Sequence, residues 1–229
     1  MKPKFSTSAI IAAAGQSSRM GLAAGLSKQF AAIGGKTVIE RTASVFESCD
    51  YIDEIIISAR EKDIAKIWEI ANAAKLGKVK NIVAGGETRQ KSVQNALEKV
   101  GSHIDFIAIH DGARCFVSQD DIKKVILKAY ETGAAAAATK VTDTIKQIDE
   151  NQNIIKTIDR AFLWAVQTPQ VFSKELYLSA LRNCRLHALD ITDDCAIFEA
   201  ADYPVSIVEC SKYNIKITDM QDLDFLKGQ

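Results

Sequence analysis

Short apolar segments alternate with amphipathic helical segments over the first two-thirds of this 229-residue chain. Strands are predicted at 9–14, 52–59, 81–84, 106–110 and 134–139, and helices at 37–46, 62–74, 89–100 and 119–131. In the third helix, Val93, Ala96, Leu97 and Val100 recur at the spacing of a single helix face. Such alternation is typical of an α/β fold, in which a mainly parallel, twisted sheet carries helices on both faces.

The pattern changes after residue 139. Between 140 and 163, apolar positions alternate on either side of the polar tip Asp149-Glu-Asn-Gln-Asn153, a composition typical of a turn between two strands. We therefore expect a β-hairpin inserted within one domain that spans 1–229. A two-stranded hairpin is marginally stable alone, so this one is expected to pack either on its own sheet or on a second chain.

Composition excludes several classes of function. The 29 lysines and arginines balance 29 aspartates and glutamates, so no overall charge favours nucleic acid or an anionic membrane. No apolar stretch approaches the ~20 residues that span a bilayer, and the segment before the first strand is too short for a signal peptide. The five cysteines and three histidines form no metal-binding pair. We expect a cytoplasmic protein without a membrane or nucleic-acid partner.

A glycine-containing turn with two downstream cations follows the first predicted strand. The chain reads Ala13-Ala14-Gly15, then small polar residues, Arg19 and, after a short loop, Lys28. Backbone N–H groups beside two cations suit a polyphosphate, whose oxygens need several donors and partial charge neutralisation. The spacing fits neither a P-loop nor the dinucleotide fingerprint Gly-x-Gly-x-x-Gly. An ordinary strand-to-loop turn with a surface arginine and lysine is the alternative interpretation.

This opening and six later segments resemble one family of enzymes. The later segments are Gly85-Gly-Glu-Thr-Arg-Gln-Lys-Ser92, His110-Asp-Gly-Ala-Arg114, Thr142-Asp-Thr144, Thr157-Ile-Asp-Arg160, Gln167-Thr-Pro-Gln170 and Asn214-Ile-Lys-Ile-Thr218. In this order they resemble the 2-C-methyl-D-erythritol 4-phosphate cytidylyltransferases, a branch of the sugar and polyol phosphate nucleotidyltransferases. The resemblance covers almost the whole chain. It implies a single Rossmann-like nucleotidyltransferase domain with a β-hairpin dimerisation arm at 140–163.

The resemblance also implies a reaction. CMP would pass from the co-substrate CTP to 2-C-methyl-D-erythritol 4-phosphate, with release of pyrophosphate and with Mg²⁺ as cofactor. This reaction brings two anions together, so catalysis rests mostly on positioning and on electrostatic stabilisation. The family pattern assigns Arg19 and Lys28 to stabilisation of the transition state, and Arg160 and Lys216 to orientation of the acceptor phosphate.

Further site residues follow from the same resemblance. The implied nucleotide site consists of Ala13, Ala14, Gly15, Gly85, Gly86, Glu87, Ser92, Asp111 and Gly112. The implied acceptor site consists of Asp111, Arg114, Thr144, Arg160, Thr168, Thr192, Lys216 and Thr218. Asp111 ends a predicted parallel strand, where open α/β sheets bind ligands. It is the expected Mg²⁺ ligand because hard cations prefer carboxylate oxygens.

Several of these positions also have a purely structural interpretation. The alternatives are a strand–turn–helix junction at Gly85–Thr88, a buried ion pair between Asp111 and Arg114, a helix start at Thr192–Asp194 and a capping box formed by Thr218 and Gln221.

The resemblance further implies a homodimer, in which the arm embraces a second subunit and carries Arg160 into the partner's active site. Two other functions are compatible with much of the pattern: ribitol 5-phosphate cytidylyltransferase, and a non-catalytic nucleotide-sensing module. The presence of Arg19, Lys28 and Asp111 argues against the second. A molybdopterin nucleotidyltransferase shares the opening turn, but the segments Gln167–Gln170 and Asn214–Thr218 argue against it.

Overall fold

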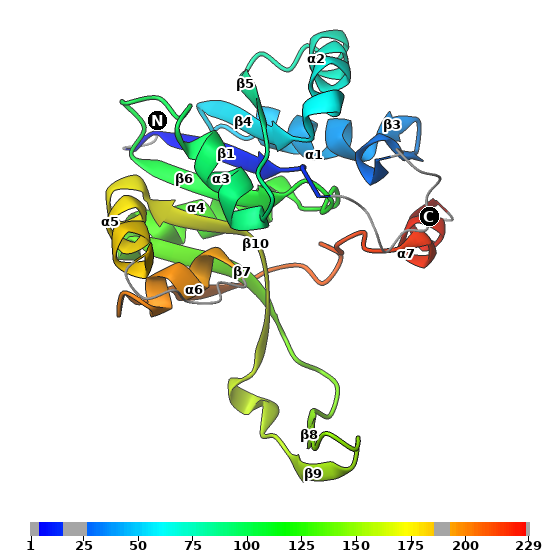
Figure 1. Ribbon diagram of the computed structural model, residues 1–229, viewed down its shortest axis with the longest axis vertical. Helices are drawn as coiled ribbons and strands as arrows, with labels where there is room; N and C mark the ends of the chain where they lie inside the picture. Colours follow the sequence, from blue (N-terminus) through cyan, green and yellow to red (C-terminus); the bar gives the residue numbers. More distant parts are fainter. Residues whose placement is uncertain (1–4, 16–26, 186–192, 228–229) are drawn as a thin grey trace.

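The computed structural model describes residues 5–15, 27–185 and 193–227, and a seven-stranded sheet forms its centre (Figure 1). The strand order is β11-β7-β10-β6-β1-β4-β5. The bounds are β1 (Thr7–Ala12), β4 (Glu54–Ala59), β5 (Val79–Ala84), β6 (Phe106–Asp111), β7 (Ala134–Lys140), β10 (Trp164–Ser173) and β11 (Ser206–Glu209). Parallel pairing joins β6, β1, β4 and β5 and also joins β7 to β11. The predicted mainly parallel sheet is confirmed, with β10 as an antiparallel strand between β6 and β7.

Helices cover both faces of this sheet, as predicted. They are α1 (Val38–Glu47), α2 (Ile64–Ala73), α3 (Arg89–Leu97), α4 (Gln119–Thr132), α5 (Lys174–Arg185) and α6 (Asp194–Glu199). Successive residues of a strand point to opposite faces. Ile11 of β1 accordingly packs in a core with α1, α2 and α4, whereas Ile10 packs in a second core with α3, α5 and α6.

Local sequence signals set the ends of several helices. Ser118 Oγ accepts a hydrogen bond from the Asp121 N–H at 3.0 Å, which caps α4. Thr88 Oγ1 caps α3 in the same way, through the Lys91 N–H at 3.1 Å. Each hydroxyl satisfies a backbone donor that has no partner inside its helix.

The predicted capping box of Thr218 with Gln221 is wrong. Helix α7 (Met220–Lys227) is capped by Asp219, whose Oδ1 accepts from the Asp222 N–H at 3.0 Å. In return, Asp222 Oδ2 accepts from the N–H groups of Thr218 at 2.7 Å and Asp219 at 3.2 Å. A carboxylate has acceptor sites for both N–H groups, so the Thr218 hydroxyl is not needed for the cap.

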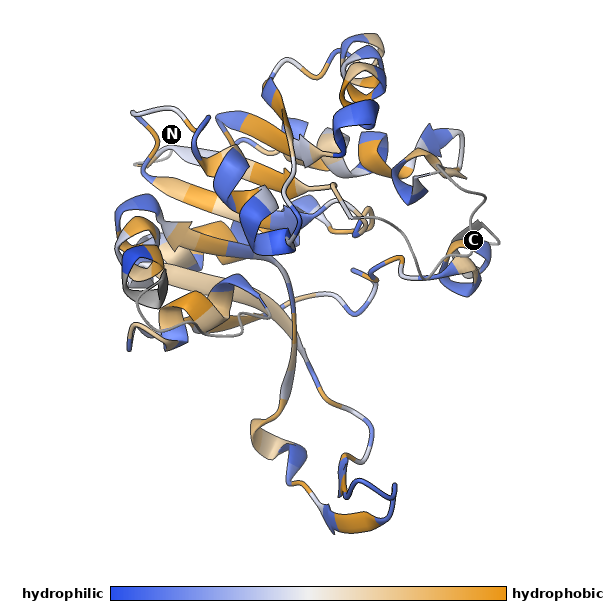
Figure 2. Ribbon diagram, viewed as in Figure 1, coloured by the Kyte–Doolittle hydropathy of each residue, from blue (hydrophilic) through white to orange (hydrophobic). Residues whose placement is uncertain are grey.

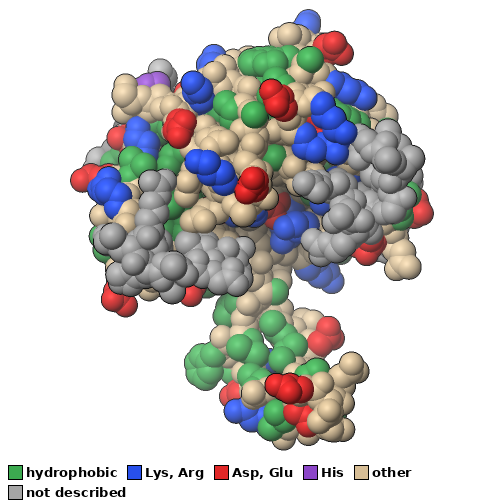
Figure 3. Space-filling model, in the orientation of Figure 1, with side chains coloured by type: hydrophobic (Ala, Val, Ile, Leu, Met, Phe, Trp, Pro, Cys, Tyr) green, Lys and Arg blue, Asp and Glu red, His purple; other side chains and the backbone are tan. Residues whose placement is uncertain are grey.

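The hairpin is confirmed and projects away from the sheet as an arm (Figure 1). It contains β8 (Lys146–Ile148), β9 (Ile154–Thr157) and the short helical turn η4 (Arg160–Phe162). Large apolar side chains of the arm are exposed, with Ile154 65% and Phe162 87% accessible. Hydrophobic residues colour parts of the arm's ribbon in Figure 2, and hydrophobic side chains are visible on its surface in Figure 3. The arm does not fold over its own sheet.

A short β-ribbon and two short helical turns lie outside the central sheet. A two-stranded ribbon of β2 (Ala32–Ile33) and β3 (Lys36–Thr37) precedes α1. Short helical turns lie at η2 (Lys28–Phe30) and η3 (Glu61–Asp63). Within the described ranges, no helix combines the length and the apolar character needed to cross a bilayer.

Neighbouring positions on α4 provide a test of this packing. Ile126 is fully buried against the sheet, whereas Leu127 is 37% exposed. We expect Ile126→Ala to lower the free energy of unfolding by about 3 kcal/mol, because it leaves a cavity in the core. Leu127→Ala should lower it by less than about 1 kcal/mol. Urea unfolding of both variants measures the difference, and equal losses would contradict this placement of α4.

Candidate functional site

A cavity of about 490 Å³ lies at the carboxyl ends of the central parallel strands. Its floor contains Gly15 beyond β1, Arg60 beyond β4, Gly85 beyond β5 and Asp111 at the end of β6. Lys28, Gln29, Lys216 and Thr218 also line this cavity. This edge of an open α/β sheet is where such folds bind ligands.

Gly85 allows two strand ends to meet at the cavity floor. A Cβ atom on Gly85 would lie 2.2 Å from the Ala14 Cβ and 2.8 Å from Ser92 Oγ. Ser92 Oγ in turn accepts from the Gly86 N–H at 3.0 Å and lies 2.9 Å from the Thr88 carbonyl. Only glycine leaves room for this arrangement, which brings backbone to the cavity wall.

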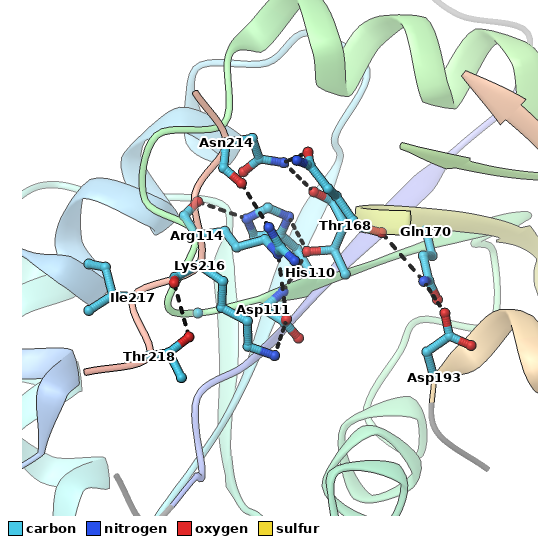
Figure 4. Close-up of polar contacts among 12 residues, drawn as sticks. His110, Asp111, Arg114, Thr168, Gln170, Asp193, Asn214, Lys216, Ile217 and Thr218 are labelled. Atoms are coloured by element: carbon cyan, nitrogen blue, oxygen red, sulfur yellow. Dashed lines mark hydrogen bonds and ion pairs between the residues drawn. The ribbon is translucent and has the colours of Figure 1, made fainter. Parts of the chain in front are cut away.

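Asp111 is the charged centre of the cavity wall (Figure 4). Its Oδ2 lies 2.8 Å from Lys216 Nζ and 3.6 Å from Arg114 Nε, and its Oδ1 lies 3.0 Å from Arg89 Nε. Arg89 also places Nη1 2.5 Å from Asp194 Oδ2. Three cations and two carboxylates therefore form one cluster beside the cavity.

The cluster favours the charged forms of Asp111 and Arg89. Burial opposes ionisation of Asp111, but the charges of Arg89 and Lys216 outweigh it and hold the pKa of this carboxyl well below its usual range. Burial likewise opposes the charge of Arg89, but Asp194 and Asp111 raise the pKa of its guanidinium above the ordinary value. Asp111 is thus an ionised carboxylate, and Arg89 a permanent cation.

A buried chain of hydrogen bonds supports the backbone of Asp111 (Figure 4). His110 Nε2 lies 3.1 Å from the Arg114 carbonyl, which can only accept, so Nε2 carries the proton. Nδ1 then accepts from Thr168 Oγ1 at 3.1 Å, and this hydroxyl accepts from the Asp111 N–H at 3.0 Å. Complete burial lowers the pKa of His110 to about 4, so the ring is neutral near pH 7.

The segment that carries Lys216 is fixed to the loop after β6. Arg114 Nη1 donates to the Asn214 carbonyl at 2.7 Å, and Asn214 Nδ2 donates to the Thr168 carbonyl at 2.7 Å. The Ile217 N–H donates to the Ala113 carbonyl at 2.9 Å. Lys28 Nζ donates to the Ile217 carbonyl at 2.8 Å. These contacts bring Lys28 and Lys216 to one side of the cavity.

Comparison with known proteins identifies the family. The sequence model of the protein family described as "IspD: 2-C-methyl-D-erythritol 4-phosphate cytidylyltransferase" matches residues 7–227 of this chain. The chain belongs to this family. It is therefore a nucleotidyltransferase enzyme, as its sequence motifs predict.

Individual relatives agree along nearly the full length. A protein named 2-C-methyl-D-erythritol 4-phosphate cytidylyltransferase from Halalkalibacterium halodurans is 40% identical over 221 residues, which cover 96% of this chain and 95% of the relative. A protein of the same name from Clostridium acetobutylicum is 43% identical over 216 residues, which cover 94% of this chain and 93% of the relative. The crystal structure of 4-diphosphocytidyl-2C-methyl-D-erythritol synthase from Anaerococcus prevotii superimposes with a TM-score of 0.85 at 31% identity, covering 97% of this chain and 94% of that chain.

Most of the site residues predicted from the family pattern line the cavity or contact residues that do. Those on its wall are Ala14, Gly15, Lys28, Gly85, Gly86, Glu87, Ser92, Asp111, Lys216 and Thr218. Those in the layer behind it are Ala13, Gly112, Arg114 and Thr168. Arg19 and Thr192 lie outside the described residues.

Two predicted residues lie elsewhere in the chain. Arg160 belongs to η4 on the arm, where its guanidinium donates to the Thr142 carbonyl, and Thr144 precedes β8. Neither is among the described residues that line the cavity. The fold of one chain therefore does not bring these arm residues to the cavity of the same chain.

Arg89 and Arg60 line the cavity, and sequence reasoning missed both. Arg89 belongs to the motif Gly85–Ser92 and lies in the first turn of α3. Its place in the sequence does not indicate that its partners are the carboxylates of Asp111 and Asp194. Arg60 follows β4 at the ligand-binding edge and pairs with Asp63 through a 2.6 Å contact. Its place immediately after a predicted strand was the signal that could have found it.

The residues that the structure describes do not make a complete metal site by themselves. Across the described ranges, no group of three or more histidine, cysteine, aspartate or glutamate side chains is placed to hold a metal ion. Asp111 nevertheless presents an ionised carboxylate to the cavity. This donor set fits a cation that brings further oxygen ligands with it, as Mg²⁺ bound to substrate phosphates does.

Gly85 and Gly15 make a matched pair for testing the cavity floor. Gly85→Ala should lower the free energy of unfolding by about 1–3 kcal/mol, because the new methyl group collides with Ala14 and Ser92. A Cβ on Gly15 meets nothing within 4 Å, so Gly15→Ala should change the same quantity by less than about 0.5 kcal/mol. Chemical denaturation measures both values. Equal effects would contradict the close approach at Gly85.

Proposed function

We propose that this enzyme transfers CMP from CTP to 2-C-methyl-D-erythritol 4-phosphate, giving 4-diphosphocytidyl-2-C-methyl-D-erythritol and pyrophosphate for the synthesis of isoprenoid precursors. The observation that carries the proposal is the cavity itself. It combines a glycine turn, Lys28, Arg89, Asp111 and Lys216 at the ligand-binding edge of the sheet. Membership of the cytidylyltransferase family supports the choice of substrates.

The nucleotide occupies the side of the cavity formed by the turns after β1 and β5. Gly85 and Gly86 let the main chain approach the base, and Ser92 holds this turn through the Gly86 N–H. Ala14 and Gly15 provide the facing turn and Glu87 lines the same cavity, with Ala13 and Gly112 in the layer behind. Backbone groups that converge from two turns recognise a base by shape and by hydrogen bonding.

The cations act on the reacting phosphates. Lys28 and Arg19 stabilise the charge that develops on the equatorial oxygens as pyrophosphate departs. Lys216, Arg114 and the hydroxyl of Thr218 contact the acceptor, whose phosphate oxygen attacks in line with the leaving group. Thr168 contributes by holding the Asp111 N–H, since its hydroxyl accepts from that group and gives its one proton to His110 Nδ1.

Asp111 would hold Mg²⁺ on the protein side, and the ion would supply charge neutralisation for the triphosphate. A single carboxylate would be sufficient, because Mg²⁺ sites of this kind use one or two carboxylates together with substrate phosphates. The charges of Arg89 and Lys216 lower the pKa of Asp111 and keep it ionised. Lys216 and Arg89 therefore also keep the metal ligand in its binding form.

The functional unit is a homodimer with shared active sites. The whole chain 1–229 forms one nucleotidyltransferase domain, and the arm 140–163 projects from it to grip a second copy. Exposed Ile148, Ile154 and Ile155 supply the apolar surface that such a contact buries. The remote location of Thr144 and Arg160 supports this assignment, because a C₂ partner brings arm residues to the opposite cavity.

Acceptor choice is tested by pyrophosphate release. We expect the purified enzyme to release pyrophosphate from CTP with 2-C-methyl-D-erythritol 4-phosphate far faster than with ribitol 5-phosphate, and far faster than from UTP, ATP or GTP. A chelator should abolish the reaction and added Mg²⁺ should restore it. A faster reaction with ribitol 5-phosphate would replace the proposed acceptor. No pyrophosphate release with any combination of nucleotide and acceptor would contradict the proposed enzyme function. Full turnover in the presence of chelator would contradict the proposed Mg²⁺ dependence.

The shared site is tested by mixing two inactive variants. Lys28→Ala should lower kcat by about two to four orders of magnitude, the scale of a preorganised cation on a transition-state oxyanion. Arg160→Ala should be similarly impaired in the other half of the site. When the two are unfolded together and refolded in equal amounts, about half of the dimers are mixed, and each mixed dimer has one intact site. Activity should then recover to roughly a quarter of that of the wild type by this counting.

Subunit exchange itself is the control for this experiment. Size-tagged copies of the two variants report the fraction of mixed dimers independently of activity. If Arg160 served its own chain, every site would still lack one residue. Mixed dimers without recovered activity would therefore contradict the shared-site model.

A further inference from the structure

Arg89 lies between two carboxylates from different parts of the chain. Its Nε contacts Asp111 Oδ1 at 3.0 Å on one side, and its Nη1 contacts Asp194 Oδ2 at 2.5 Å on the other. The three residues belong to α3, β6 and α6. An arginine can hold two carboxylates at once because its guanidinium presents donors in a fixed planar fork.

Asp194 is itself held from two further directions. It is only 1% exposed, and its Oδ1 accepts from the Tyr177 hydroxyl at 2.7 Å. Its backbone N–H donates to Gln170 Oε1 at 3.1 Å. Gln170 Nε2 donates to Asp193 Oδ2 at 2.8 Å, a contact visible in Figure 4. The carboxylate of Asp194 therefore has a single orientation, fixed from the protein interior.

This anchored carboxylate determines how the cavity wall is arranged. Asp194 does not line the cavity, whereas Arg89 and Asp111 do. Arg89 contacts Oδ1 of Asp111, whereas Lys216 and Arg114 contact Oδ2. The Lys216 side chain is 40% exposed and has the most freedom of these groups. Its location depends on which way the Asp111 carboxylate faces.

We propose that Asp194 is a positioning residue for nucleotidyl transfer, which acts through Arg89 to orient Asp111 and the Lys216 ammonium bound to it. This inference rests on the proposed function. Without the charge of Asp194, Arg89 keeps only one carboxylate partner and its guanidinium rotates toward the cavity. Asp111 then turns with it, and the contact with Lys216 is lost. A displacement of about 1 Å in such a group is enough to lower a rate by roughly 100-fold.

The kinetic test uses Asp194→Asn, Arg89→Gln and the double variant. Asparagine has the shape of aspartate and still accepts from Tyr177, but it lacks the charge that holds Arg89. We expect Asp194→Asn to lower kcat by about 10- to 100-fold, with KM for CTP changed by less than about 3-fold. Arg89→Gln should lower kcat at least as much. The double variant should match Arg89→Gln within about 3-fold, because a residue that acts only through Arg89 has no effect once Arg89 is gone.

Ile126→Ala provides the matched control for stability. It weakens the core on the opposite face of the sheet, remote from these contacts, and its kcat at 25 °C should equal that of the wild type. The comparison holds when thermal denaturation gives Asp194→Asn and Ile126→Ala the same Tm. If Asp194→Asn then lowers kcat no more than Ile126→Ala does, the role of Asp194 is structural and the inference is overturned. Independent losses that multiply in the double variant overturn it as well.

Crystal structures of the wild type and Asp194→Asn measure the positioning step without turnover. In the variant we expect a rotated Arg89 guanidinium and a broken contact between Lys216 Nζ and Asp111 Oδ2. An unchanged contact would overturn the inference even if kcat falls. A wild-type enzyme that fails to release pyrophosphate would instead overturn the proposed function, while these structures would still decide whether Asp194 orients the cluster.

Discussion

The ionised carboxylate of Asp111 is the constraint on which the site depends. Its side chain is only 10% exposed, and a charge at that depth requires partners. Arg89, Arg114 and Lys216 supply them from α3, from the loop after β6 and from the segment that follows β11. One interaction thus ties three distant parts of the chain to the same edge of the sheet. With Asp194 included, the three cations exceed the two carboxylates, so the cluster attracts anions.

Three buried polar residues, His110, Thr168 and Asn214, support this centre through hydrogen bonds. The neutral ring of His110 and the hydroxyl of Thr168 join end to end, and the chain finishes at the Asp111 N–H. Asn214 links the Lys216 segment to the Thr168 carbonyl of β10. Because buried polar groups are costly unless paired, this network leaves the segment few alternative positions. A site for charged phosphates is in this way built on rigid elements.

Local structure was largely predictable. The hydroxyls of Thr88 and Ser118 cap their helices, and the polar tip at 149–153 makes the turn of the hairpin, because each of these depends on residues close in sequence. Strand β10 was missed, since its pairing partners lie far away along the chain. The alternative interpretation of Thr218 as the cap of α7 is wrong, because the neighbouring Asp219 accepts the hydrogen bond instead. Competition between adjacent polar residues is not visible in a motif alone.

The sequence by itself determined the alternation of strands and helices, the ligand-binding edge and the family, because these follow from periodicity and from motifs in a fixed order. It also indicated Asp111 and Lys216 as site residues. Only the tertiary structure decided that Arg89 meets Asp194, 105 residues further along the chain, and that the arm with Arg160 lies away from its own cavity. Such contacts depend on how strands are ordered and how far a hairpin projects, and neither property is encoded in local spacing.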